Sequence, residues 1–138
     1  MTYREEATPG PVVVTGYLDV YAFDRATGAM LWQQKTPSSV RRFIVTDDRV
    51  FVLLGDATMM CFDAMSGTLL GSVPTPLSGG EALLYDRGTL FAVGSKGVVA
   101  LDRSGQVLWT QPLPTNFDTT LRGVGVAGQV CQPDYDTR

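Results

Sequence analysis

A short segment of this chain occurs three times at a constant spacing, and this repeat limits the possible folds more than any other feature. The copies lie at residues 22–32, 61–71 and 100–109, the third being one residue shorter in its turn. Each copy contains an aspartate, and successive aspartates are 39 residues apart: Asp24, Asp63 and Asp102. Self-similarity at such a period is typical of solenoids, propellers and other repeat arrays.

The residues around these segments predict short β-strands. Runs of β-branched and aromatic residues are separated by Gly, Asp, Ser or Pro, without the period of about 3.6 residues that indicates a helix. We label the strands of a repeat a, b, c and d in chain order. The second repeat has predicted strands at 41–47, 50–55, 58–63 and 68–73, and the third at 81–85, 89–94, 97–102 and 106–111. Each repeat is therefore expected to be a small antiparallel meander.

The first and last repeats are predicted to be incomplete. Residues 4–6, which would form strand a of the first repeat, read Arg-Glu-Glu and are too polar for an inner strand. The first repeat keeps strands b, c and d, at 12–15, 20–23 and 30–35. At the other end, residues 121–126 resemble a further strand a. The predicted order is thus b-c-d, a-b-c-d, a-b-c-d, a.

The repeats are expected to align without gaps through strand b. Val12 then corresponds to Phe51 and Leu90 at the period of 39 residues. The aligned region, residues 12–131, holds three repeats and the start of a further one. It is flanked by a polar leader at 1–11 and a polar tail at 132–138.

Composition indicates a folded domain and excludes several functions. Of 138 residues, 44% are hydrophobic, and the net charge of −3 comes without a basic stripe, so nucleic acid is not an expected partner. The absence of histidine excludes Ser-His-Asp triads and His-ligated metals. No apolar run approaches the roughly 18 residues of a membrane span, and residues 1–11 lack a signal-like apolar core. We expect a cytoplasmic protein as the sequence is written, or a periplasmic or extracellular one if the chain is a processed fragment.

The two cysteines are not spaced as a zinc site. Cys61 occupies the position held by Ala22 and Ala100 in the other repeats, so we expect it to be a small buried hydrophobic residue. The role of Cys131 stays open.

The first repeated segment carries a resemblance to a known family. Its pattern, Ala22-x-Asp24-x-x-Thr27-Gly28-x-x-x-Trp32, resembles the tryptophan-docking motif of the quinoprotein-dehydrogenase β-propellers. The surrounding repeats are similar to the pyrroloquinoline-quinone-type repeats found also in the propeller lipoprotein that assists outer-membrane protein assembly. The resemblance implies an all-β fold in which each repeat is a four-stranded antiparallel blade, so that the chain is a partial β-propeller.

The resemblance also implies how neighbouring blades meet. Trp32 should stack on the peptide at Gly67 and donate its indole N–H to a main-chain carbonyl around Ala64, which would seal the seam and satisfy the one donor of the ring. In the second repeat Gly71 replaces the tryptophan, so we expect the next seam to be weaker. The residues implied to form the seams are Ala22, Asp24, Gly28, Trp32, Asp63, Gly67, Asp102, Gly105 and Trp109.

The quinone-binding apparatus of those enzymes does not match this sequence. There is no adjacent pair of cysteines to cover a quinone, and no Glu, Asn and Asp set for calcium falls on equivalent positions. We expect no cofactor, no metal and no catalytic residue, and therefore no enzyme. The repeated aspartates are explained by turn chemistry, since an Asp followed by Ser or Thr and Gly bonds its own backbone.

Three blades are too few for a ring of their own, because closed propellers typically use four to eight. Two flat apolar faces and unpaired strand edges would be exposed. Either two copies form a six-blade ring, with residues 121–126 of one completing the first blade of the other, or a second polypeptide supplies the remaining blades. In the dimer, Trp109 should reach Gly28, near Arg25, of the partner.

A candidate ligand site lies where the d-to-a loops enter the inner strands. Arginines at this channel mouth would hold an anionic ligand or an acidic peptide, although solvated loop-end charges are the simpler explanation. The candidate residues are Arg41, Arg42, Glu81 and Arg122. The favoured function is a non-catalytic, self-assembling scaffold that presents loops for protein or small-ligand binding. The alternative is part of a quinoprotein-like oxidoreductase whose cofactor site forms only in the complete propeller.

Overall fold

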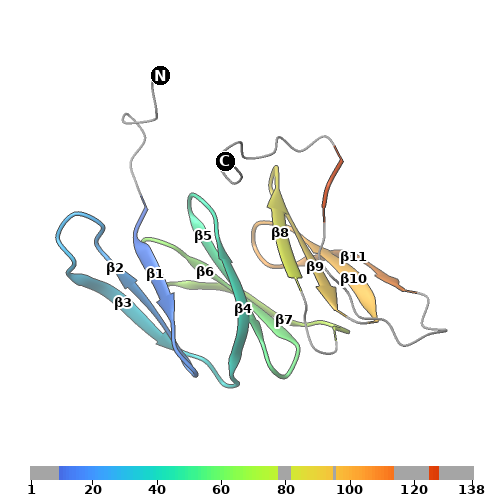
Figure 1. Cartoon of the computed structure of the whole chain (residues 1–138), viewed down its shortest axis with the longest axis horizontal. Helices are drawn as coiled ribbons and strands as arrows, with labels where there is room; N and C mark the ends of the chain where they lie inside the picture. The colour runs from blue at the N-terminus through green and yellow to red at the C-terminus, as the bar shows by residue number, and fades with distance from the viewer. Residues whose placement is uncertain (1–9, 78–81, 95, 114–124, 128–138) are drawn as a thin grey trace, which may run out of the picture.

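The computed structural model of the chain describes residues 10–77, 82–94, 96–113 and 125–127 (Figure 1). Every regular element in these residues is a β-strand, and none of the described segments is a helix able to cross a membrane. The strands are β1 (Val12–Thr15), β2 (Asp19–Phe23), β3 (Met30–Lys35), β4 (Val40–Val45), β5 (Arg49–Leu54), β6 (Thr58–Asp63), β7 (Leu69–Pro74), β8 (Ala82–Asp86), β9 (Thr89–Gly94), β10 (Gly97–Leu101) and β11 (Val107–Pro112).

The strands form three antiparallel sheets, each made of strands consecutive in the chain. Their orders are β1-β2-β3, β4-β5-β6-β7 and β8-β9-β10-β11. Figure 1 shows the sheets side by side, following one another as blades one, two and three. The predicted series b-c-d, a-b-c-d, a-b-c-d is confirmed, and the structure is an open, partial propeller. The further strand predicted at residues 121–126 lies largely outside the described residues.

The gap-free alignment is wrong by one residue in β5. Ala22 lies opposite Val13, whereas its equivalent Cys61 lies opposite Phe51, so Phe51 corresponds to Val13 and not to Val12. The physical reason is an extra residue between the paired positions: five residues separate Leu53 from its partner Met59, whereas four separate Thr15 from its partner Val20. Because side chains alternate between the two faces of a strand, a shift of one residue exchanges the faces.

Two layers of apolar side chains hold the blades together. Alternate residues of β5 enter different layers, as the two-residue period of a strand requires. Between blades one and two lie Val20, Ala22, Trp32, Val50, Val52, Leu54, Met60, Phe62 and Ala64. Between blades two and three lie Phe51, Leu53, Met59, Cys61, Leu77, Leu90, Ala92, Val99 and Leu101. Blade two is thus buried on both faces.

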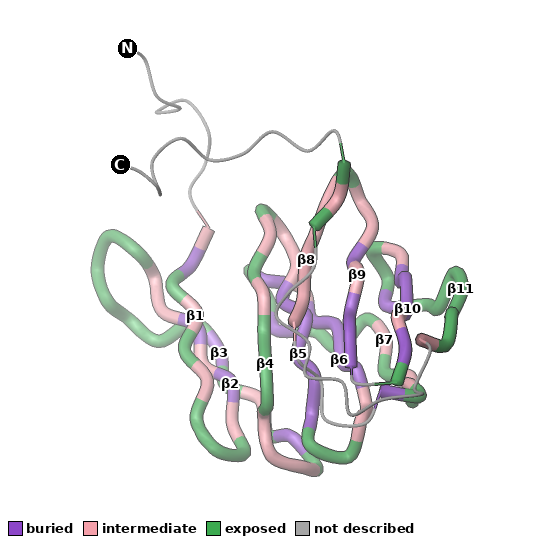
Figure 2. The backbone as a smooth tube through the Cα atoms, turned by 45° about the vertical axis from the view of Figure 1, so that its right-hand side comes forward, coloured by how far each residue is buried: buried purple, intermediate pink, exposed green. Residues whose placement is uncertain are grey.

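Blades one and three each keep one face uncovered by other described residues. The three blades together form a wedge. Figure 2 shows the buried residues concentrated in the middle of this wedge, with β11 exposed along its length. On blade one, Val12 and Val14 are nearly half exposed, and they lie opposite Phe23 and Tyr21 on the face turned away from blade two.

Candidate functional site

The first seam is built around Trp32. Trp32 lies opposite Ala22 in the sheet of blade one and is only 9% exposed. Its Nε1 donates a 2.8 Å hydrogen bond to the carbonyl oxygen of Ala64 in blade two. A Cβ atom added at Gly67, where φ is +76°, would lie 2.6 Å from ring atoms of Trp32. The indole therefore lies directly on the glycine, and its ring centroid is 6.0 Å from that of Phe62.

A second hydrogen bond at this seam was not predicted from the sequence. Gln34, two residues after Trp32 on β3, donates from Nε2 to the carbonyl oxygen of Gly67 at 2.7 Å. The turn of blade two is therefore held at both of its ends by side chains of blade one. The only signal in the sequence is the two-residue spacing, which places both side chains on one face of the strand.

The three repeated aspartates are turn residues and do not converge. One carboxylate oxygen of each accepts backbone N–H groups of its own turn at 2.7–3.0 Å. These bonds favour the ionised form and lower the pKa of each aspartate. The largest cause is the N–H of the residue three positions on for Asp24 and Asp63, and the hydroxyl of Ser104 for Asp102.

The second seam, which lacks a tryptophan, is closed by backbone. Gly71 lies opposite Cys61, in the register that Trp32 has with Ala22. A Cβ at Gly71 would collide with the carbonyl oxygen of Ser104, so the strand of blade two runs against the turn of blade three. Glycine permits this approach because it has no side chain.

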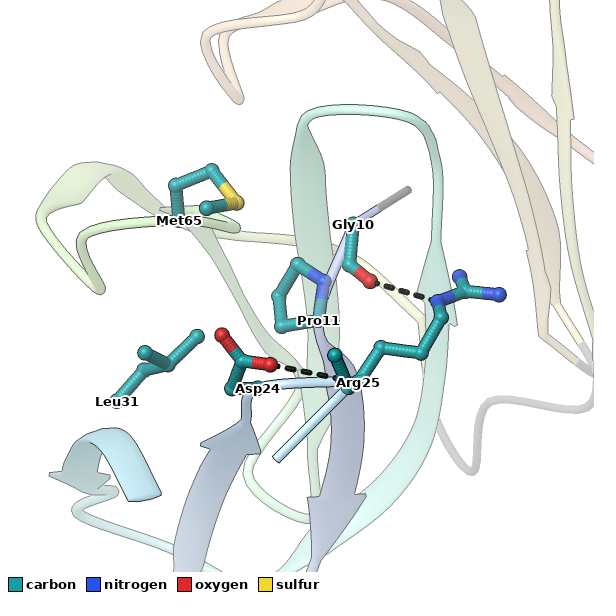
Figure 3. A pocket seen from close by; sticks show the side chains of 7 residues that line it. Gly10, Pro11, Asp24, Arg25, Leu31 and Met65 are labelled. Carbon is teal, nitrogen blue, oxygen red and sulfur yellow. Dashed lines mark hydrogen bonds between the residues drawn. The ribbon is translucent and has the colours of Figure 1, made fainter. Parts of the chain in front are cut away.

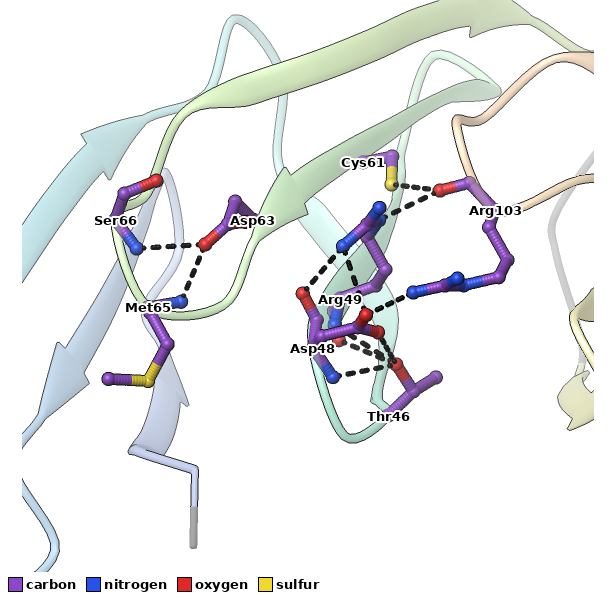
Figure 4. A network of polar contacts seen from close by, with 8 residues as sticks. All are labelled: Thr46, Asp48, Arg49, Cys61, Asp63, Met65, Ser66 and Arg103. Carbon is purple, nitrogen blue, oxygen red and sulfur yellow. Dashed lines mark hydrogen bonds and ion pairs between the residues drawn. The ribbon is translucent and has the colours of Figure 1, made fainter. Parts of the chain in front are cut away.

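Polar side chains complete the second seam (Figure 4). The carbonyl oxygen of Arg103, which follows Asp102 as Ala64 follows Asp63, accepts a 3.0 Å hydrogen bond from Nε of Arg49 and a 3.5 Å contact from Sγ of Cys61. The guanidinium of Arg103 forms an ion pair with Asp48. The equivalent carbonyl is thus used at both seams, by an indole in one and by an arginine and a thiol in the other. Whether this seam is weaker stays a prediction.

Cys61 has the surroundings of a structural residue. The residue is fully buried in the second layer, as predicted. Burial raises the pKa of its thiol to about 11, so the thiol is protonated near neutral pH. A protonated, buried thiol is a poor nucleophile and a poor metal ligand.

Two of the expected seam residues, Trp109 and Gly28, lie at opposite ends of the wedge. Trp109 lies opposite Ala100 as Trp32 lies opposite Ala22, yet it is 46% exposed. Its ring contacts Phe91 of its own blade, with centroids 6.2 Å apart. At the other end Gly28 has φ +79°, and a Cβ there would meet no atom of the described residues within 4 Å. Among the described residues the structure therefore assembles one tryptophan seam, and a contact of Trp109 with Gly28 of a second copy stays a prediction.

The channel-mouth candidates are only partly described. Arg41 and Arg42 lie on the inner strand β4 and are exposed. Glu81 and Arg122 lie outside the described residues. The proposed ring of charges is therefore neither built nor excluded by the described residues.

A pocket of about 260 Å³ lies beside the first seam (Figure 3). Its lining includes Pro11, Asp24, Leu31 and Met65. Pro11 precedes β1 at the position corresponding to Arg49 in blade two, and its short ring cannot reach the neighbouring turn as Arg49 does.

A second, open pocket of about 480 Å³ lies at the turns of blades two and three. It is lined by Thr46, Asp47, Asp48, Tyr85 and Arg103. Among the residues that the structure describes, no three His, Cys, Asp or Glu side chains gather as they would around a metal ion.

A family model described as the outer membrane protein assembly factor BamB matches residues 9–132. The crystal structure of BamB from Moraxella catarrhalis is 27% identical with a TM-score of 0.64, covering 74% of this chain and 34% of that one. The chain thus spans about a third of that protein. A search of curated proteins found no match.

Two further solved structures show the fold alone. A europium-containing methanol dehydrogenase is 19% identical with a TM-score of 0.56, covering 75% of this chain and 24% of its own. The computationally designed Ika4 protein is 20% identical with a TM-score of 0.66, covering 76% of this chain and 68% of its own.

Proposed function

The chain belongs to the family of the outer membrane protein assembly factor BamB, and from this membership we propose that it is a non-catalytic propeller scaffold. Its loops bind a protein or a small ligand. The observation that carries the proposal is that the polar and nucleophilic side chains near the seams are already engaged in the fold. The turn aspartates accept hydrogen bonds from backbone N–H groups, and the Cys61 thiol is buried. These side chains stabilise the blades, so the loops are the part of the molecule proposed to bind a protein or a small ligand.

The scaffold is proposed to assemble from more than the three described blades. The apolar faces at both ends of the wedge, with Val12 on one and Trp109 on the other, support this because exposed apolar surface of this kind is usually an interaction site. Two copies would give six blades, a number within the range of closed propellers. Remaining blades on another polypeptide are the alternative arrangement, compatible with the short span relative to BamB.

The family supports a protein partner and one of the two expected locations. A family named for outer membrane protein assembly works at the cell envelope, which favours the periplasm over the cytoplasm for this chain. The binding face is proposed to be the end that carries the d-to-a loops, where Arg41 and Arg42 follow Val40 at the start of β4.

The scaffold and the oxidoreductase alternative are separated by a thermal-shift experiment with the full chain. Pyrroloquinoline quinone and calcium, alone and together, should leave the melting temperature unchanged. A saturable stabilisation that requires both would contradict the scaffold and favour a quinoprotein. Binding of an acidic peptide, lost in Arg41→Gln with Arg42→Gln but kept in Arg87→Gln at the opposite end of the blades, would support the loop face.

A further inference from the structure

The open pocket at the turns of blades two and three is lined by polar side chains that the repeat does not require. We propose that it binds an arginine side chain presented by a partner protein, with the carboxylates of Asp47 and Asp48 receiving the guanidinium beside the ring of Tyr85. The pocket follows the end of β4, whereas the proposed loop face lies at its start. The inference therefore goes beyond the proposed function and does not rest on it.

Two neighbouring blades supply the walls of this pocket. Thr46, Asp47 and Asp48 form the turn between β4 and β5 of blade two, while Tyr85 and Arg103 come from β8 and from the turn after β10 in blade three. The volume of about 480 Å³ lies within the roughly 300–1,000 Å³ of ligand pockets. Because these blades share an apolar layer, the pocket does not depend on the outer faces of blades one and three.

The polar set occurs at one of the two seams. The positions that correspond to Asp48, Tyr85 and Arg103 at the first seam are Gly10, Val45 and Ala64, as the strand register and the turn spacing show. The first seam thus closes with small or apolar residues where the second has charged and aromatic ones. A repeated architecture does not explain side chains found at a single seam, and such residues are where a function can be added to the fold.

The charges of the lining favour a cation. The pocket holds two carboxylates, Asp47 and Asp48, against the single guanidinium of Arg103. Asp47 is exposed, and its carboxylate forms no hydrogen bond or ion pair with a described residue. Arg49 is directed into the seam, where it donates to the backbone carbonyls of Asp48 and Arg103. The negative charge of Asp47 therefore has no counterpart in the pocket.

The ion pair of Asp48 with Arg103 can be exchanged for a pair with a ligand (Figure 4). The two side chains are 48% and 46% exposed, and an ion pair in such surroundings contributes little to stability. A guanidinium from a partner can thus take the place of Arg103 at Asp48, while Asp47 supplies a second carboxylate. The partner gains both charges, and the seam keeps its backbone contacts.

Arginine suits this set of side chains better than a metal ion or a lysine does. Among the described residues no three His, Cys, Asp or Glu side chains gather as metal ligands would. A guanidinium offers carboxylates a planar fork of donors and stacks on aromatic rings, whereas a lysine ammonium is a compact point charge. Tyr85 supplies an aromatic ring whose place is fixed by Phe51, with ring centroids 5.9 Å apart.

Three blocked tripeptides, titrated into the nitrogen-15-labelled full chain, test the class of ligand. The probe is acetyl-Gly-Arg-Gly-amide, and the other two carry citrulline, which lacks the charge, or glutamate at the central position. The arginine peptide should shift the amide signals of Thr46, Asp47 and Arg103 saturably, and the citrulline peptide should bind about fivefold more weakly or less. Tighter binding of the glutamate peptide, or no saturable shift at these amides, would overturn the proposal.

Charge-removing variants test the assigned roles. Asp47→Asn should weaken binding of the arginine peptide about fivefold, whereas Asp56→Asn, the same change at the opposite end of β5, should not. Arg103→Gln removes the competing cation but keeps the carbonyl that Arg49 uses, so it should tighten binding. Equal effects of the two aspartate variants, or loss of binding in a folded Arg103→Gln chain, would contradict the site. The peptide series on the unaltered chain decides the matter if a variant fails to fold.

Discussion

Nε1 of Trp32 lies 2.8 Å from the carbonyl oxygen of Ala64, a residue 32 positions later in the chain and one blade away. The bond fixes the turn of blade two against the last strand of blade one. Because the ring also covers Gly67, one side chain determines both the separation and the orientation of two sheets. Trp109 has the same cross-strand position on blade three and is 46% exposed.

Removal of the Trp32 side chain should destabilise the fold strongly. Trp32→Ala leaves a cavity in a closed seam and an unpaired carbonyl at Ala64, so we expect a loss of about 3–5 kcal/mol in the free energy of unfolding. Trp32→Phe keeps apolar contact but loses the donor, at a cost of roughly 1–3 kcal/mol plus the smaller ring volume. Chemical denaturation at fixed protein concentration measures both. Stability equal to the unaltered chain would contradict the seam, as would association weakened more by Trp32→Ala than by Trp109→Ala.

The second seam should tolerate no side chain at Gly71. Gly71→Ala places a Cβ against the backbone oxygen of Ser104, which cannot move like the end of a flexible side chain. We expect destabilisation of roughly 1–3 kcal/mol, the range for overpacked interiors. Gly16→Ala is the matched control, because its Cβ would meet only ordinary contacts of 3.7 Å or more. Equal melting temperatures for the two variants would show that the blades are not in close contact at this point.

The sequence predicts some parts of the fold and of the candidate site and not others. The strands follow from a local pattern, since turn residues and strand alternation act over a few positions. The contact of Trp32 with Ala64 and Gly67 is instead implied by the resemblance of residues 22–32 to the tryptophan-docking motif. The register of β5 does not follow from the sequence pattern, because the extra residue between Leu53 and Met59 leaves the 39-residue spacing of Asp24 and Asp63 unchanged.

The polar contacts of the second seam have no comparable signal in the sequence. Arg49 and Arg103 are 54 residues apart, and nothing periodic links an arginine at the start of a strand to a carbonyl in the next blade. The sequence predicts a missing contact at Gly71, whereas in the structure the absent side chain permits the close approach of the two blades. Such contacts depend on the distance between sheets, which the sequence does not state.

Acid should loosen the turns that hold the blades. The pKa values of Asp24, Asp63 and Asp102 are lower in the folded chain than in the unfolded chain, where the pKa of aspartate is about 3.9. Their stabilising effect is therefore complete above that pH and is lost as the pH falls through the lowered values. Asp63→Asn should reduce stability at neutral pH and flatten its fall between pH 5 and pH 2, values taken as roughly the range of aspartate titration. If the stability of Asp63→Asn fell with decreasing pH as steeply as that of the unaltered chain, the stabilising role of the Asp63 carboxylate would be contradicted.

Cys61 should react slowly with thiol reagents in the folded protein. A thiol with a pKa of about 11 is ionised at neutral pH on the order of one part in ten thousand, and its side chain is also buried. In a Cys131→Ser background, labelling should be limited by opening of the seam between blades two and three and should accelerate in denaturant. Rapid labelling without denaturant would show that this seam is open in solution.

The molar mass of the full chain in solution, followed by light scattering over a range of concentrations, tests the central claim most directly. The account predicts a reversible species of twice the 14.9 kDa chain mass, weakened by Trp109→Ala and not by Leu108→Ala. A well-folded species that keeps the mass of one chain at every concentration would contradict it.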